Sequence, residues 1–151
     1  MSNQPVKDFE LPATGATRFK LSEAGAKTLV FYFYPKDNTP SCTTEALQFR
    51  DLHAEFKRAG AAIYGISRDS VRSHENFKAK LKIPFELLSD EDESVCRQFG
   101  VIKMKNMYGK QVRGIERSTF VLDATRAIRR EWRGVKVPGH VAEVLDFVKT
   151  L

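Results

Sequence analysis

Cys42 is the residue of this sequence best placed for nucleophilic or redox chemistry. It follows an apolar and aromatic run, residues 28–34, and directly precedes a segment with helical spacing. The start of a helix offers unpaired backbone N–H groups and the positive end of the helix dipole, and both favour a thiolate. Such a position predicts an activated nucleophile. The alternative is a small buried side chain that only fills space, a frequent role of a lone cysteine.

The second cysteine, Cys96, has a different setting. It shares an apolar stripe with Val95 and Phe99 and has no evident activating group, so we predict a packed structural thiol. Two cysteines are too few for a disulfide scaffold and lack metal-ligand spacing, and free thiols indicate a reducing compartment, here the cytoplasm. The segment that begins at Cys42 reads Cys-Thr-Thr-Glu, which lacks the second thiol of a thiol–disulfide oxidoreductase motif.

The elements that must position Cys42 alternate between strands and helices. Residues 28–34 show no polar alternation, which is typical of a central strand buried on both faces, and Pro35 ends the run. Apolar residues three and four apart predict a helix from about Thr43 to Ala59. The rest of the pattern predicts a hairpin over residues 9–21 and strands over 61–67 and 85–88. It also predicts a helix capped by Asp69 or Ser70 and a short helix capped by Ser89. A loop over 101–114 should lead into strands over 115–122 and 128–132 and a last helix from about Pro138.

This order of elements predicts an α/β fold with a central mixed sheet, helices on both faces and an N-terminal β-hairpin. The chain of 151 residues shows no linker, repeat or low-complexity segment, so we expect residues 1–151 to form one domain. The N-terminus lacks the apolar core of a secretory signal, and no apolar stretch reaches the roughly 20 residues that a membrane span requires. We expect no membrane association.

The net charge of +6 is unevenly distributed. Residues 103–136 contain ten basic residues and three acidic ones. A solvated face is the favoured interpretation of this segment. The alternative is a non-enzymatic protein that binds nucleic acid or another acidic partner through the segment. No helix-turn-helix, RNA-binding or zinc-finger signature accompanies it, and we expect no specific nucleic-acid binding.

Several motifs resemble those of one enzyme family. Pro35, Thr39 and Cys42 form the pattern Pro-x-x-x-Thr-x-x-Cys, which is the signature of the peroxiredoxins, and Cys42 falls on their peroxide-attacking cysteine. Further agreement, over most of residues 9–151, is found at Glu45 and in residues 49–51, 88–91, 108–110 and 114–120. Together these motifs resemble the Q-type subgroup, also called bacterioferritin comigratory proteins. The resemblance implies a thioredoxin-like fold and a thiol peroxidase.

The resemblance also implies roles for individual residues. Thr39 would offer its hydroxyl to the thiolate and to a peroxide oxygen, and Pro35 would shield the site from water. Arg117 is predicted to lie in a strand, and the family places its guanidinium beside Cys42, where it would hold the thiolate and polarise the O–O bond. A salt bridge at the end of a strand is the alternative for this arginine. Glu45, one helical turn after Cys42, would orient Arg117 or serve only as a first-turn carboxylate favoured by the helix dipole.

The implied reaction needs no metal, flavin or haem. The Cys42 thiolate attacks hydrogen peroxide or an organic hydroperoxide and becomes a sulfenic acid, which thioredoxin, glutaredoxin or a small thiol then reduces. Many Q-type members carry a resolving cysteine five residues after the first, where this chain has Leu47. We therefore favour a one-cysteine mechanism with an external thiol, and the alternative is a two-cysteine mechanism in which Cys96 resolves.

Two further expectations concern assembly and histidines. We expect a monomer, with a weak homodimer as the alternative. His53, His74 and His140 show no ligand spacing and no evident relation to the cysteines, and we predict that all three lie at the surface.

Overall fold

The computed structural model describes residues 4–151 and contains the elements that the sequence pattern predicts, with some changes at their ends. In chain order they are β1 (Glu10–Ala13), β2 (Thr17–Lys20), the 3₁₀ turn η1 (Leu21–Glu23), β3 (Thr28–Phe33), α1 (Pro40–Arg58), β4 (Ala61–Ser67), α2 (Val71–Leu81), β5 (Leu87–Ser89), α3 (Ser94–Gln98), β6 (Ile102–Met107), β7 (Lys110–Ile115), β8 (Ser118–Leu122), β9 (Ile128–Arg133) and α4 (His140–Val148).

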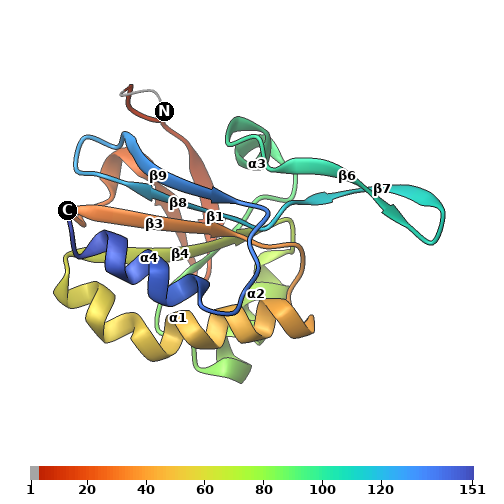
Figure 1. Cartoon of the computed structure of the whole chain (residues 1–151), viewed down its shortest axis with the longest axis horizontal. Helices are drawn as coiled ribbons and strands as arrows, with labels where there is room; N and C mark the ends of the chain where they lie inside the picture. Colours follow the sequence, from red (N-terminus) through yellow and green to blue (C-terminus); the bar gives the residue numbers. More distant parts are fainter. Residues whose placement is uncertain (1–3) are drawn as a thin grey trace.

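Within residues 4–151, seven strands form one mixed sheet in the order β2-β1-β5-β4-β3-β8-β9 (Figure 1). Strands β3, β4 and β5 run parallel, and the remaining pairs are antiparallel. β3 lies between β4 and β8, and each of its six residues is buried, as the absence of polar alternation predicts. The predicted α/β architecture with a central mixed sheet and an N-terminal hairpin is confirmed.

Helices cover both faces of this sheet, and a separate apolar core fills each side (Figure 1). On one side, α1, α2 and α4 pack against alternate residues of β3, among them Val30 and Tyr32. On the other side, α3 and the N-terminal strands pack against Phe31 and Phe33. Across residues 4–151, none of the helices has both the length and the apolar character that crossing a bilayer demands.

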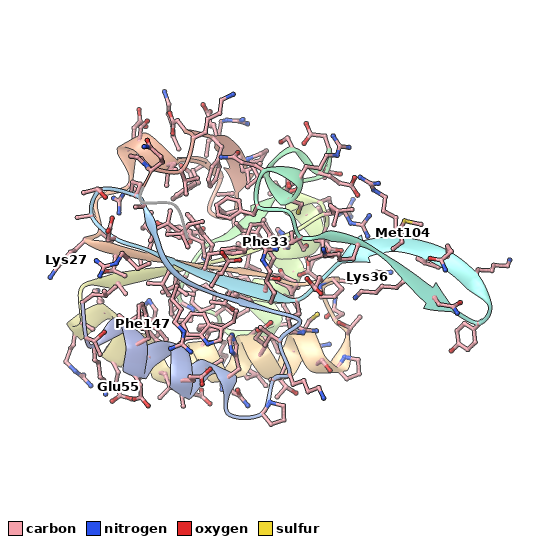
Figure 2. The ribbon with its side chains drawn as sticks, turned by 45° about the horizontal axis from the view of Figure 1, so that its top comes forward. Lys27, Phe33, Lys36, Glu55, Met104 and Phe147 are labelled. Atoms are coloured by element: carbon pink, nitrogen blue, oxygen red, sulfur yellow. The ribbon has the colours of Figure 1, made fainter. Side chains whose placement is uncertain are left out.

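The segment predicted as a loop, residues 101–114, is instead a β-hairpin arm formed by β6 and β7. The arm projects away from the sheet, as Figures 1 and 2 show, and its tip residue Tyr108 is fully exposed. Tyr108 and Gly109 both have positive φ, which a two-residue hairpin turn requires. The loop prediction was wrong because the arm's strands are solvated on both faces, so they lack the apolar alternation that marks a half-buried strand.

The arm is tied to the body of the protein through Glu93. This carboxylate accepts hydrogen bonds from Arg113 of β7 (2.9 Å) and from Arg68, which follows β4 (2.9 Å). The hydrogen bond from Arg113 and the contact with Arg68 lower the pKa of Glu93 to about 2. The base of the arm is thus held by an ion pair that persists through the neutral pH range.

Two other boundaries differ from the prediction. The helix that carries Cys42 begins at Pro40, three residues earlier than expected, because proline is well suited to the first turn of a helix, where no backbone donor is needed. The short helix predicted to start at Ser89 begins only at Ser94, because Ser89 is the last residue of β5 and Glu93 adopts a left-handed conformation.

The outer strands of the sheet, β2 and β9, each have one unpaired edge within the described residues. Both carry several basic side chains: Arg18 and Lys20 on β2, and Arg129, Arg130 and Arg133 on β9.

Candidate active site

Cys42 lies in the first turn of α1, directly after the loop that leaves β3. Thr39 is the N-cap residue, and the N–H of Thr43 donates the first hydrogen bond of the helix to the Thr39 carbonyl (2.9 Å). The backbone N–H groups before Thr43 therefore have no partner within the helix and surround the cysteine with partial positive charge. Only 1% of Cys42 is exposed, so the thiol is sheltered from bulk water.

Arg117 bridges the thiol and a carboxylate. Its Nη2 donates to Cys42 Sγ (3.3 Å), and its Nη1 donates to Glu45 Oε1 (2.7 Å). The prediction that Arg117 lies in a strand was wrong, because it occupies the two-residue connection between β7 and β8. The N–H of Glu116 still donates to the Val101 carbonyl (2.7 Å), and the pairing of β8 with β9 begins only at Ser118, so Arg117 lies between two ladders.

Glu45 is fully buried next to Arg117. The sequence alone did not decide whether Glu45 contacts Arg117 or serves only as a first-turn carboxylate. Its Oε1 is paired with Arg117, whereas its Oε2 has no hydrogen-bond partner among the described residues. Burial raises the pKa of Glu45 from 4.5 to about 7, against the lowering effect of Arg117. The carboxyl group therefore changes protonation in the neutral range, beside the cation that contacts the thiol.

Replacement of Glu45 by glutamine should flatten the pH dependence of stability. The folded chain binds the Glu45 proton up to a pH of about 7 and the unfolded chain only to about 4.5, so the parent loses stability as pH rises through this window. Between about pH 5 and about pH 8, the free energy of unfolding of the parent should fall by about 2 kcal/mol more than that of Glu45→Gln. Urea unfolding at both pH values measures the difference. Equal losses in the two proteins would show that Glu45 does not titrate in this window.

Thr39 and Pro35 lie in the loop beside Cys42 and are both half-buried. The hydroxyl of Thr39 donates to the carbonyl of Lys36 (2.7 Å), so its hydrogen is directed toward the loop. The structure thus brings Cys42, Arg117 and Glu45 into direct contact, and Thr39 and Pro35 lie in the loop that precedes α1.

Cys96 lies in the other half of the protein. It belongs to the core beneath α3, whereas Cys42 belongs to the core beneath α1, so the central sheet separates the two. Cys96 is fully buried, and burial together with the nearby Asp90 carboxylate raises the pKa of its thiol far above the usual value. Its backbone N–H donates to Asp90 Oδ2 (2.7 Å). These surroundings are those of a packing residue.

The prediction that all three histidines lie at the surface was wrong. His53 is half-buried, whereas His74 and His140 are buried. His140 Nε2 lies 2.8 Å from Thr119 Oγ1, and burial lowers the pKa of His140 to about 4. A signal for His74 was present in the sequence, because it lies three residues after Val71 and three before Phe77, on the apolar stripe of α2.

His74 also belongs to a group whose spacing could suit a metal ion. Among the described residues, ligand atoms of Asp37, Asp69 and His74 lie within 4.8 Å of one another. However, one ring nitrogen of His74 faces Asp37 and the other faces the Leu88 carbonyl, so the ring has no lone pair directed at a common centre. This group does not fit a metal site, because imidazole binds metals through an unprotonated nitrogen.

Several basic residues of segment 103–136 have partners within the protein. Arg129 pairs with Asp123 (3.6 Å), and Arg130 lies over the rings of Trp132 and Phe147, at 4.5 Å and 5.5 Å from their centres.

Comparison with known proteins agrees with the fold. The model of the AhpC/TSA family matches residues 2–131. Peroxiredoxin Bcp of Xanthomonas campestris is 54% identical over 147 residues, which cover 96% of this chain and 92% of that protein. Peroxiredoxin Bcp of Bacillus subtilis is 46% identical over 148 residues, which cover 98% of this chain and 94% of the relative.

Solved structures give the same result. A structure of Xanthomonas campestris peroxiredoxin Q superimposes with a TM-score of 0.90 at 54% identity, covering 94% of this chain and 90% of the other. A second structure, with a TM-score of 0.89 at 54% identity and the same coverage, comes from a study of alkyl peroxide reduction by the Xanthomonas campestris bacterioferritin comigratory protein. The predicted thioredoxin-like fold is confirmed.

A thioredoxin-like fold with a sheltered cysteine at a helix start defines the class of thiol-based oxidoreductases. The chain belongs to the AhpC/TSA family, and its similarity is to the Bcp, or Q-type, peroxiredoxins. It is therefore a thiol-dependent peroxidase, as the motifs of the sequence imply.

Proposed function

We propose that Cys42 is the peroxidatic nucleophile and that it reduces hydrogen peroxide and organic hydroperoxides. The observation that carries this proposal is the guanidinium of Arg117, which donates to Cys42 Sγ and is held by Glu45. A cation with several fixed donors stabilises the thiolate and can also bind the peroxide oxygen that departs.

In the proposed reaction, the Cys42 sulfur forms a bond to one peroxide oxygen while the O–O bond breaks. The sulfur is oxidised from thiolate to sulfenic acid, and the peroxide is reduced. The departing oxygen takes up a proton and leaves as water or as an alcohol. Thr39 and Pro35 would line the site from the loop side, with Pro35 limiting the entry of water. The alkyl peroxide reduction described for the Xanthomonas campestris relative supports organic hydroperoxides as substrates.

For the reductive half of the cycle we propose a one-cysteine mechanism, in which an external thiol reduces the sulfenic acid. Two observations support it: Leu47 occupies the position of a nearby resolving cysteine, and the sheet separates Cys42 from Cys96. A disulfide requires Cα atoms no more than about 7 Å apart, so the two cysteines could pair only after a large rearrangement. Thioredoxin, glutaredoxin or a small thiol would supply the electrons to a monomer in the cytoplasm, where such reductants are kept.

Addition of one equivalent of peroxide without reductant should leave a sulfenic acid on Cys42. Intact mass should increase by one oxygen atom, and dimedone should label the Cys42 peptide. Cys96→Ser should turn over at the parent rate with dithiothreitol as the reductant. Excess peroxide should then convert Cys42 to the sulfinic acid, because no internal thiol intercepts the intermediate. A loss of two hydrogen atoms, with a peptide that links Cys42 to Cys96, would instead establish the two-cysteine mechanism.

A further inference from the structure

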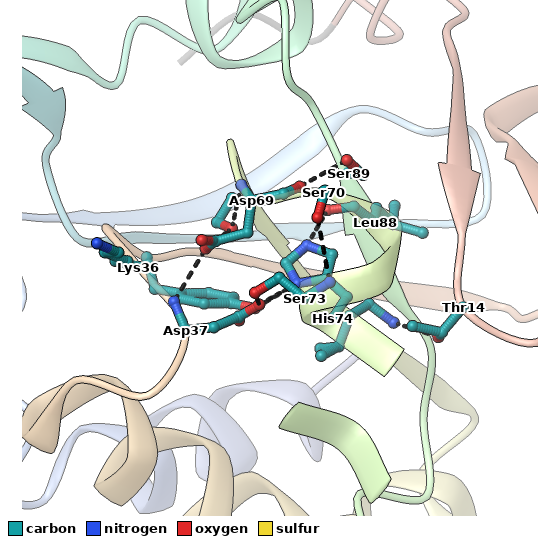
Figure 3. Close-up of polar contacts among 12 residues, drawn as sticks. Thr14, Lys36, Asp37, Asp69, Ser70, Ser73, His74, Leu88 and Ser89 are labelled. Carbon is teal, nitrogen blue, oxygen red and sulfur yellow. Dashed lines mark hydrogen bonds and ion pairs between the residues drawn. The ribbon is translucent and has the colours of Figure 1, made fainter. Parts of the chain in front are cut away.

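The loop between β3 and α1 is held by a buried aspartate, Asp37. Figure 3 shows the polar contacts around it. Oδ1 of Asp37 accepts a hydrogen bond from the hydroxyl of Tyr34 (2.6 Å), and Oδ2 accepts one from the hydroxyl of Ser73 (2.8 Å). The backbone N–H of Asp37 donates to Asp69 Oδ2 (2.9 Å). The loop that leads to Cys42 is thereby fastened to α2 and to the residues after β4.

His74 of α2 completes this arrangement from the interior of the protein. Its Nδ1 lies 2.7 Å from Asp37 Oδ2, its Nε2 lies 2.9 Å from the carbonyl oxygen of Leu88, and its side chain is fully buried. Because a carbonyl oxygen can only accept, Nε2 carries a hydrogen. Nδ1 lies within hydrogen-bond distance of Asp37 Oδ2, which also accepts from Ser73, so the ring is held at both of its nitrogens. His74 and Asp37 therefore form a buried, hydrogen-bonded pair.

A short chain of contacts connects this pair to the start of α1. Asn38, the residue after Asp37, has a left-handed conformation with φ of 63°. The hydroxyl of Thr39 then closes the turn by donating to the Lys36 carbonyl (2.7 Å), and the Thr39 carbonyl accepts the first hydrogen bond of α1. The position of Asp37 thus determines where the helix begins, and with it the position of Cys42 relative to Arg117.

We propose that His74 and Asp37 are positioning residues for the peroxidase reaction. Neither residue forms a hydrogen bond with Cys42. The pair fixes the loop that places Pro35 and Thr39 beside the thiol. This inference rests on the proposed role of Cys42 as the nucleophile. A peroxide must meet Cys42, Arg117 and the loop in one geometry, and a displacement of about 1 Å can reduce such a rate roughly 100-fold.

The test compares two reactions of the same thiol in His74→Gln. Glutamine can still donate to the Leu88 carbonyl but has no second ring nitrogen to contact Asp37. Oxidation of Cys42 by hydrogen peroxide, followed in single turnover by quenched mass analysis, should slow by at least about tenfold. Alkylation of Cys42 by iodoacetamide requires a thiolate but no peroxide geometry, so its rate should stay within about twofold of the parent. His53→Gln, the same change on α1, serves as the matched control and should alter neither rate.

A double-mutant cycle tests whether His74 and Asp37 act as a unit. Asp37→Asn alone should slow the peroxide reaction, and Asp37→Asn combined with His74→Gln should cost little more than the larger single effect. Additive losses would show that the two residues act separately and would overturn the proposal.

Other outcomes would also overturn it. An unchanged peroxide rate in a folded His74→Gln protein would do so, as would an equal loss in oxidation and alkylation, which indicates general disorder.

If His74→Gln does not fold, Tyr34→Phe and Ser73→Ala each remove one hydrogen bond from Asp37 and leave the pair intact. Both should slow oxidation more than alkylation, and unchanged rates in both would reject positioning by this loop. Failure of parent Cys42 to react with peroxide would reject the proposed function instead.

Discussion

Cys42→Ser should lower peroxide turnover by at least about 10⁴-fold, because the loss of a nucleophile removes the whole covalent pathway. A serine hydroxyl stays protonated at neutral pH, and the adjacent guanidinium of Arg117 cannot act as the base that would activate it. Serine has the same shape as cysteine and a smaller end atom, so it fits the core around residue 42 without a clash. Turnover with dithiothreitol and hydrogen peroxide measures the effect, and circular dichroism checks the fold.

Cys96→Ser is the matched control for this experiment. It makes the same chemical change in the core on the opposite face of the sheet and should retain turnover. Substantial turnover by Cys42→Ser, or loss of turnover in a folded Cys96→Ser protein, would contradict the assignment of the nucleophile to Cys42.

Arg117→Met should reduce the rate of Cys42 oxidation by about 10²–10³-fold, the usual cost of removing one preorganised donor from a developing charge. Methionine keeps a long apolar side chain but has neither the cation nor the forked donors. The variant also loses the hydrogen bond from Arg117 Nη2 to Cys42 Sγ. Single-turnover oxidation of Cys42 by hydrogen peroxide measures the effect.

Arg113→Met provides the control for Arg117. Arg113 also pairs with a carboxylate, but it lies on the projecting arm, and its guanidinium binds Glu93 rather than Cys42. This variant should lose the tie between the arm and the body and keep the rate of thiol oxidation. If Arg117→Met behaves in the same way, Arg117 serves only as a salt-bridge partner of Glu45.

The sheet and its helices could be predicted because the spacing of their apolar residues indicates which faces are buried. β3 has six consecutive apolar or β-forming residues, and α2 begins where Ser70 accepts a hydrogen bond from Ser73 N. The position of Cys42 at a helix start followed from the same patterns. These features depend on spacing along the chain, which a sequence shows.

The features that were missed depend on contacts between distant segments. The arm formed by β6 and β7 has no buried face, so its residues carry no periodic signal. His74 was predicted at the surface although it lies on the apolar stripe of α2, because the partner that makes a buried histidine favourable, Asp37, lies 37 positions away in the sequence. Arg117 was placed in a strand because nothing local marks the break at Glu116 and Arg117, where pairing passes from β6 to β3 and β9 of the main sheet. Resemblance to a family, rather than periodicity, indicated that Arg117 lies near Cys42.

The basic side chains on the outer strands have a consequence for molecules that meet edge to edge. An unpaired strand presents a row of N–H and C=O groups that could extend the sheet into a neighbouring copy. On β9, such pairing would bring the charged side chains of Arg129, Arg130 and Arg133 beside those of the neighbouring copy. Arg18 and Lys20 impose the same penalty at β2. The positive charge of the β9 region therefore opposes intermolecular β-pairing and fibril-like growth of the sheet.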